Sequence, residues 1–164
     1  MGWNRRRVMM GAAAAITLSL AVGALAVGAG AQTLVTFPRG QAEVVTKAGK
    51  HHAFTVELAT THDQLTQGLM FRRTLAADAG MLFDFGEDKP VTMWMRNTLI
   101  PLDMLFVAND GRVVGIKERA VPQSSDIIAA PEPVRGVLEL NGGTAQRLGL
   151  SAGDRVVHPM FERK

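Results

Sequence analysis

The sequence predicts a mainly β fold, a compact antiparallel β sandwich or barrel with two short helices, and an α+β arrangement is the alternative. Strand-like apolar runs alternate with Gly-, Asn- and Asp-rich turns along most of the chain. Only two segments, near Thr61 and Thr144, carry helix-start signals, and no glycine-rich phosphate loop follows a strand-like run. The 164 residues, 47% of them apolar, suffice for one core.

The domain is predicted to begin after a short approach segment. Residues 32–42 contain Pro38 and Gly40 and are expected to lead into the domain. Residues 43–164 contain no linker and no internal repeat, so they are predicted to form one globular domain.

The first elements of the domain follow from periodicity and capping signals. Residues 54–59 alternate apolar and polar side chains, which is typical of a half-buried strand. Thr61, with Gln64 three positions later, resembles a capping box and predicts a helix of about two to three turns. Residues 80–85 form a short apolar run that indicates a second strand, and residues 86–90 are predicted to be a polar turn.

The middle of the chain has the pattern of a hairpin. Residues 91–97 and 102–108 are strand-like, and the Asn-Asp-Gly sequence at 109–111 is a strong turn signal. Residues 112–119 are therefore predicted to return as the partner strand.

The C-terminal part is predicted to add two strands and the second helix. A strand over 134–140 is followed by an Asn-Gly-Gly turn, after which Thr144 is placed to cap a short helix that Gly149 ends. The turn before the last strand, 155–160, contains Asp154, which is expected to accept backbone N–H groups and hold that turn closed.

The first 31 residues have the organisation of an export signal. Asn4 is followed by three arginines at 5–7, residues 8–31 are uncharged and rich in Ala and Gly, and Ala-Gly-Ala precedes Gln32. The arginines also resemble a twin-arginine signal. The alternative is an uncleaved inner-membrane anchor, because 24 helical residues reach roughly 36 Å. In both cases the domain is expected in the periplasm or outside the cell, with membrane contact only through residues 8–31.

Composition and charge exclude several classes of function. The chain has no cysteine, which rules out a disulfide framework, a thiolate metal site and a cysteine nucleophile. The net charge of +3 belongs to Arg5, Arg6 and Arg7, and the remaining 15 basic residues equal the 15 acidic ones. No global field attracts residues 32–164 to phosphates, so no nucleic-acid partner is predicted.

Asp103 interrupts a run, 102–107, that is apolar on both faces of its strand. A carboxylate in such a position is expected to be buried and to need a cation or donated hydrogen bonds. Arg96, Asn97 and Thr98 precede it and offer a guanidinium, an amide and a hydroxyl. The pattern predicts either a polar ligand site on these residues or a salt bridge that fixes the corner between them.

Methionine is concentrated before Leu105. Thioethers bind copper(I), so copper handling is one interpretation, whereas core or cleft packing is the other. The five residues are Met70, Met81, Met93, Met95 and Met104. The four histidines lack the spacing of a metal site, and no metal or cofactor is predicted.

Trp94 is the only tryptophan after the leader, and it suits either a ligand groove or the core. A cleft is predicted around it, bordered by the long loop that precedes Pro133. The candidate binding residues are Trp94, Met95, Arg96, Asn97, Thr98 and Asp103, with Met70, Arg72 and Glu118 at the margin.

Several short motifs together resemble the bacterial and archaeal domain-of-unknown-function family 192. The match covers about residues 43–160, and its motifs are Gly-Leu-Met-Phe-Arg at 68–72, Gly-Met-Leu-Phe at 80–83, Trp-Met-Arg-Asn-Thr at 94–98 with Pro-Leu-Asp at 101–103, and Val-Leu-Glu-Leu at 137–140 before Gly-Asp at 153–154. The resemblance implies a compact, mainly β domain that is often exported or membrane-tethered. It supplies no reaction and no catalytic residues.

The leading hypothesis is a non-enzymatic extracytoplasmic binding module for a small polar or anionic ligand, a peptide or an envelope partner. Arg96 would recognise a carboxylate or phosphate, and Trp94 would supply apolar area. One alternative is an envelope hydrolase or lyase in which Asp103 or Glu118 is the general base and Arg96 stabilises an anion. Copper handling through the methionines is a second alternative.

Overall fold

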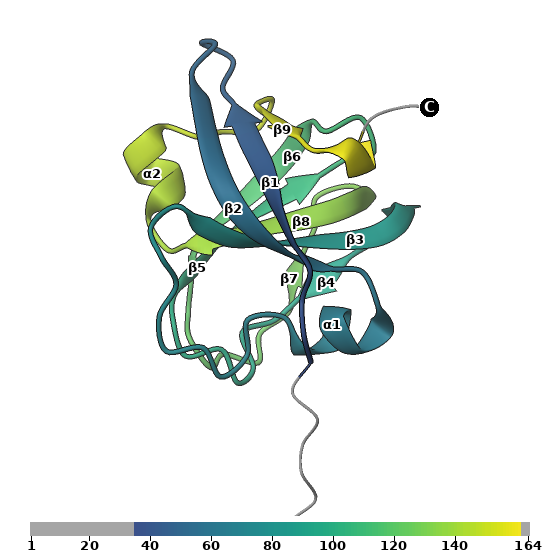
Figure 1. Ribbon diagram of the computed structural model, residues 1–164, viewed down its shortest axis with the longest axis vertical. Coiled ribbons are helices and arrows are strands. Elements are labelled where there is room, and N and C mark those ends of the chain that lie inside the picture. The colour runs from purple at the N-terminus through teal and green to yellow at the C-terminus, as the bar shows by residue number, and fades with distance from the viewer. Residues whose placement is uncertain (1–34, 162–164) are drawn as a thin grey trace, which may run out of the picture. The chain divides into compact units, whose positions relative to one another are not determined.

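The computed structural model describes residues 35–161, which form one curled seven-stranded sheet (Figure 1). Neighbouring strands are antiparallel except β2 and β3, which are parallel. The strand order is β6 (Val113–Ala120), β5 (Leu102–Val107), β8 (Val134–Asn141), β3 (Ala79–Lys89), β2 (His51–Ala59), β1 (Arg39–Val45) and β9 (Arg155–Val157).

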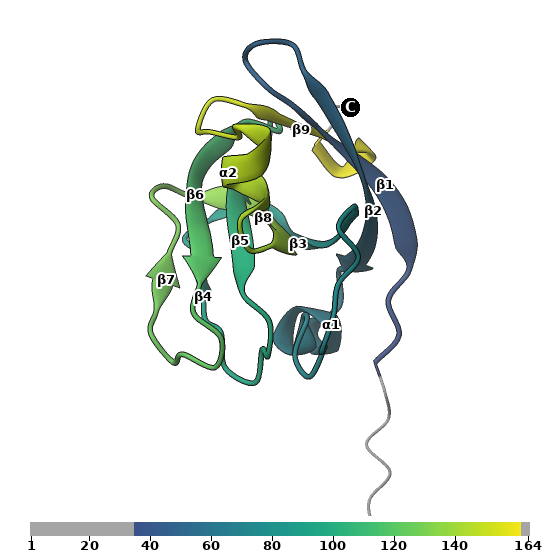
Figure 2. The same ribbon diagram turned by 90° about the vertical axis from the view of Figure 1, so that its left-hand side faces the viewer.

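The two outer strands of this order approach each other at one end, so the sheet curls into a half-barrel (Figure 2). Arg112 forms an isolated bridge with Arg155. The Val113 N–H donates to the Asp154 carbonyl at 2.8 Å, and the Gly153 N–H donates to the Val113 carbonyl at 2.8 Å. The predicted mainly β, barrel-like domain with two short helices is confirmed.

The remaining elements pack against both faces of the sheet. Helix α1 (His62–Gln67) starts with the predicted capping box: the Gln64 N–H donates to the Thr61 hydroxyl at 3.4 Å, and the Thr61 N–H donates to the Gln64 amide oxygen at 3.1 Å. The other elements are β4 (Thr92–Met93) and β7 (Ile128–Ala129), which pair with each other, α2 (Thr144–Leu148) and a 3-10 turn, η1 (Pro159–Phe161).

Both faces of the sheet are buried, each in its own core. The first core receives side chains from all seven strands and from α2. The second core lies against β3, β5 and β8 and includes side chains from α1 and β4. Strand β5 serves both, because Leu105 and Val107 pack in the first core and Leu102, Met104 and Phe106 in the second. The expectation that this strand is apolar on both faces is confirmed.

Two sequence predictions on the N-terminal side are wrong. Residues 39–42, assigned to the approach segment, belong to β1, whose pairing with β2 runs from Arg39 opposite Glu57 to Val45 opposite His51. Residues 86–89, predicted as a turn, continue β3 instead. The strand is irregular there: the register shifts between Asp84 and Lys89, Gly86 has a φ of 86°, and Lys89 again lies opposite Val134.

The predicted strand at 91–97 is also shorter in the structure. Only Thr92–Met93 pair with another strand, and residues after them form a turn in which the Thr98 N–H donates to the Met95 carbonyl at 3.0 Å. Asn97 has a left-handed φ of 58°, which interrupts an extended strand.

At the C-terminal side, Gly143 rather than Thr144 is the N-cap of α2, and Thr144 is its first residue. Gly143 has no side chain that could accept from the helix, and a distant carboxylate accepts from the Ala145 N–H instead, as described below. The last strand ends at Val157 rather than 160. Pro159 has no backbone N–H for a sheet ladder, and it starts the 3-10 turn.

The predicted leader, residues 1–31, lies outside the described residues. Within residues 35–161, none of the helices has the length and apolar character needed to cross a bilayer.

Candidate functional site

A cavity of about 280 Å³ opens between α1, the segment that follows it, β3 and β4. We call it the α1 pocket. Its mouth consists of the exposed lining residues His62, Thr66, Thr92 and Trp94, and Trp94 is 42% exposed. Its floor consists of the buried lining residues Gly68, Leu69, Phe83, Thr98 and Glu139. Between them lie partly buried side chains, among which are Met70, Phe85 and Met93.

Strand β8 places Glu139 at the floor by simple alternation. Leu138 and Leu140 point into the first core, and Val137 packs in the second. Because alternate residues of a strand share a face, Glu139 lies on the second-core face with Val137. Its register partners on the two neighbouring strands are Met81 and Met104, both of which are fully buried.

One oxygen of the Glu139 carboxyl, Oε2, is buried without a polar partner among residues 35–161. Glu139 as a whole is 4% exposed. Burial raises the pKa of this carboxyl from 4.5 to about 8, because the charged form loses its hydration and gains nothing in return. At neutral pH the group is therefore mostly protonated and uncharged.

The charge of the α1 pocket is set by very few groups. Glu139 is the only carboxyl among its lining residues within 35–161, and none of these residues is a lysine or an arginine. His62 at the mouth is the other titratable side chain of the lining. The pocket therefore offers an aromatic and thioether wall with a single acidic group at its inner end.

The structure brings part of the predicted cleft together at this pocket. Met70, Trp94 and Thr98 line it. Arg96 lies beside the mouth, with its guanidinium carbon 5.0 Å from the centre of the Trp94 ring. The Asn97 side-chain amide lies 4.0 Å from the Met70 sulfur.

Four other predicted residues do not line the pocket. Met95 is fully buried in the second core. Arg72 pairs with Glu57 on β2. Glu118 is exposed on β6. Asp103 lies on the opposite face of β5, where its neighbours Leu105 and Val107 enter the first core.

Asp103 is fully buried and holds three backbone amides. Its Oδ1 accepts from the Arg119 N–H at 2.8 Å and the Gly143 N–H at 3.0 Å, and its Oδ2 accepts from the Ala145 N–H at 2.7 Å. The sequence allowed a salt bridge between Asp103 and Arg96, and no such ion pair is found among residues 35–161. Asp103 lies on the first-core face of β5, whereas Arg96 lies beside the α1 pocket on the other face. Its carboxylate instead caps α2 from outside the helix.

Asp154 has the structural role that the sequence predicted. Its Oδ1 accepts from the Lys47 N–H at 2.9 Å, and its Oδ2 accepts from the Ser151 N–H at 2.7 Å. The carboxylate thus joins the turn after β1 to the turn before β9.

The methionines divide between the core and the pocket. Met81, Met95 and Met104 are fully buried in the second core, whereas Met70 and Met93 line the α1 pocket. Residues 35–161 contain no group of three or more His, Cys, Asp or Glu side chains that could hold a metal ion.

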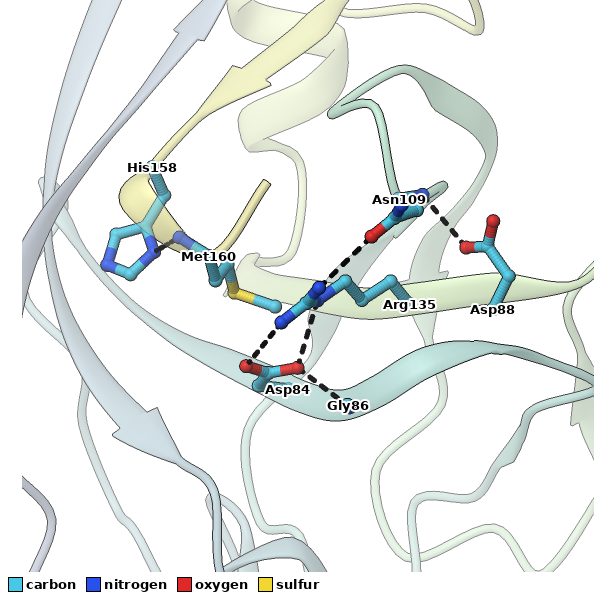
Figure 3. Close-up of polar contacts among 7 residues, drawn as sticks. All are labelled: Asp84, Gly86, Asp88, Asn109, Arg135, His158 and Met160. Carbon is cyan, nitrogen blue, oxygen red and sulfur yellow. Dashed lines mark hydrogen bonds and ion pairs between the residues drawn. The ribbon is translucent and has the colours of Figure 1, made fainter. Parts of the chain in front are cut away.

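A second polar cluster lies where β3 and β8 meet the turn at 109–111 (Figure 3). The Arg135 guanidinium donates to both oxygens of Asp84, at 3.3 and 3.4 Å, and to the Asn109 side-chain oxygen at 3.1 Å. The Asn109 N–H donates to the Asp88 carboxylate at 2.8 Å. Because its donors and acceptors satisfy one another, this cluster serves to fasten the hairpin turn to the sheet.

Sequence reasoning missed Glu139, the most informative residue of the site. The signal was present, since one carboxylate interrupts the apolar run at 137–140 just as Asp103 interrupts its own run. The sequence could not show which of the two finds donors. Asp103 meets three amides brought by distant segments, and Glu139 meets a cavity.

Comparison with known proteins supports the motif resemblance. Residues 43–158 match the family model DUF192, described as "Uncharacterized ACR, COG1430". A crystal structure from Sinorhizobium meliloti 1021, described as a "putative transcription regulator", is 54% identical, with a TM-score of 0.74 over 75% of this chain and 95% of that one. A protein of unknown function from Novosphingobium aromaticivorans DSM 12444 is 40% identical, with a TM-score of 0.71 over 76% and 91%. A search of curated proteins found no match.

Proposed function

Because the chain belongs to the DUF192 family, whose description states no activity, we propose its function from its own geometry: it is a non-enzymatic binding domain that holds a small ligand in the α1 pocket. The observation that carries this proposal is the Glu139 carboxyl, buried without a partner for Oε2 at the floor of an aromatic and thioether cavity. Ligand sites are typically apolar cavities with a few polar groups at fixed positions.

Binding is favoured over catalysis by what surrounds Glu139. A general base or nucleophile works with a second group in hydrogen-bond reach that orients it or shares its proton. Among the described residues the Oε2 atom has no such group, and its flanking register partners are methionines. Asp103, the base of the hydrolase hypothesis, is fully buried and bonded to three amides.

We propose that this domain works in the periplasm or outside the cell. The support is the order of basic, apolar and small residues in 1–31, which suits either a cleaved signal or an inner-membrane anchor. The regulator role named for the Sinorhizobium protein finds no support in the charge of this chain. Residues 32–164 have equal numbers of basic and acidic side chains and thus no field that attracts DNA.

Two readouts on the full chain in mild detergent test ligand binding. The chain has no tyrosine, so a Trp3→Phe variant leaves Trp94 as the only indole that reports on the pocket mouth. Dicyclohexylcarbodiimide, which reacts with protonated carboxyls in apolar surroundings, reports on Glu139 by mass spectrometry. A panel of small amines, alcohols and carboxylates is titrated against both.

A pocket ligand is expected to change Trp94 emission, to protect Glu139 from the carbodiimide and to raise the melting temperature by mass action. Glu118→Gln is the matched control, because Glu118 is an exposed carboxylate on β6 and does not line the pocket. A panel in which no compound changes emission or protects Glu139 contradicts the proposed function.

A further inference from the structure

We propose that the α1 pocket selects a small organic cation, an amine in its ammonium form, which pairs with the Glu139 carboxylate at the floor. This inference rests on the proposed binding function and adds the chemical class of the ligand.

The first argument is the unsatisfied oxygen. Buried carboxyl oxygens are normally hydrogen-bonded, and an unpaired one marks a site with a missing partner. The Oε2 atom of Glu139 is such an atom, and the residue lines a cavity rather than solid core. An ammonium group supplies three donors and a compensating charge, which is the pairing that a buried carboxylate requires.

The second argument is the charge of the walls. An anionic ligand would find no arginine or lysine among the described lining residues, and Arg96 is engaged with Trp94 beside the mouth. A cation meets one carboxyl instead. This distribution favours an ammonium over the carboxylate or phosphate that the sequence had suggested.

The third argument is the aromatic lining. The electron-rich faces of Trp and Phe rings attract cations, and this attraction grows as water is excluded. Arg96, 5.0 Å from the centre of Trp94, and the Lys89 amine, 5.6 Å from the centre of Phe85, already occupy part of these two rings, so Glu139 is the main attraction for the ammonium. The cavity of about 280 Å³ limits the ligand to a small amine.

Pairing changes the protonation of Glu139. The ligand keeps its proton as ammonium, the Glu139 carboxyl releases its proton to solvent, and an ion pair forms. No other carboxyl lines the pocket within residues 35–161; Met81 and Met104 flank Glu139 from β3 and β5, and His62 on α1 is the remaining titratable lining group. Affinity for an amine is therefore expected to increase as pH rises and more Glu139 is ionised.

The test compares three four-carbon probes that differ in their polar group: butylammonium, 1-butanol and butyrate. Titrations on the full-length Trp3→Phe chain are run from pH 6 to pH 9. Butylammonium is expected to bind at least tenfold more tightly than the other two at pH 8.5. Its affinity is expected to rise about tenfold per pH unit below the pKa of Glu139 and then to level off. Calorimetry in two buffers of different ionisation enthalpy is expected to show one proton released per ligand at pH 6.5.

Two variants complete the design. Glu139→Gln removes the charge and is expected to lose the pH dependence and at least tenfold in butylammonium affinity. His62→Asn removes the other titratable group of the lining and is expected to keep the pH profile. If Glu139→Gln does not fold, protection of wild-type Glu139 from carbodiimide by butylammonium, and not by butanol, gives the same information.

The outcomes separate the two proposals. If butanol or butyrate binds as tightly as butylammonium, or more tightly, the pocket does not select cations, although it still binds a ligand. A pH profile that disappears in His62→Asn also overturns the assignment to Glu139. If the whole panel of amines, alcohols and carboxylates fails to change Trp94 emission and to protect Glu139, the binding function fails, and the cation inference fails with it.

Discussion

The Glu139 carboxyl gives the protein a pH-dependent stability. In the unfolded chain its pKa returns to the ordinary 4.5, whereas burial raises the pKa in the folded chain to about 8. The folded state therefore holds this proton over a range in which the unfolded state releases it. The favourable contribution is complete below pH 4.5, and it is lost as pH rises to about 8.

Glu139→Gln is expected to abolish this loss. The variant should be more stable than the wild type by a few kcal/mol at pH 9 and similar to it at pH 5, because the amide stays uncharged throughout. Urea unfolding at a series of pH values from 4 to 9 measures the difference. Parallel profiles for the two proteins would show that Glu139 does not titrate in this range.

At the scale of the element, α2 depends on a residue 40 positions away from its cap. Asp103→Ala leaves the amides of Arg119, Gly143 and Ala145 without their acceptor, at two part-buried positions and one buried one. Each buried unsatisfied group costs about 1–3 kcal/mol, so we expect a destabilisation of at least about 2 kcal/mol in urea unfolding. The exposed control, Glu118→Ala, should stay within about 0.5 kcal/mol of the wild type. A small loss for Asp103→Ala would show that water replaces the carboxylate.

Local signals predicted some elements well. The capping box at Thr61 and Gln64 is formed, and the turn at 109–111 connects β5 to β6. Strand β1, which depends on its neighbours in the sheet, was not predicted. Strand β1 contains Gly40 and follows Pro38, and it forms because β2 on one side and β9 on the other satisfy its backbone groups.

At the scale of the whole molecule, the half-barrel is closed by contacts between its outer strands. Asp154→Ala removes the acceptor of the Lys47 and Ser151 amides next to the bonds between β6 and the β9 turn. We expect faster hydrogen exchange at the Val113 and Val156 amides and a loss of about 1–3 kcal/mol in stability. Asp126→Ala, at an exposed loop position, is the control. Unchanged protection of both amides would show that the closure is independent of Asp154.

The candidate site could be predicted only in part. Met70, Trp94 and Thr98 were predicted as cleft residues and do line the α1 pocket. Asp103 and Glu118 were grouped with them because they are near in sequence or polar. Alternation along β5 instead points Asp103 toward α2, and Glu118 is exposed on β6.

The family motifs, the mainly β character, the capping box and the burial of Asp103 could all be predicted from local sequence, because each depends on neighbouring residues and on the twofold periodicity of a strand. Which buried carboxylate finds hydrogen-bond donors depends on how distant segments pack against each strand. Asp103 receives amides from three distant positions, whereas Glu139 faces the cavity beneath α1. Alternation along a strand sets the face of the sheet on which a side chain lies. The groups that this side chain contacts depend on which other segments pack against that face.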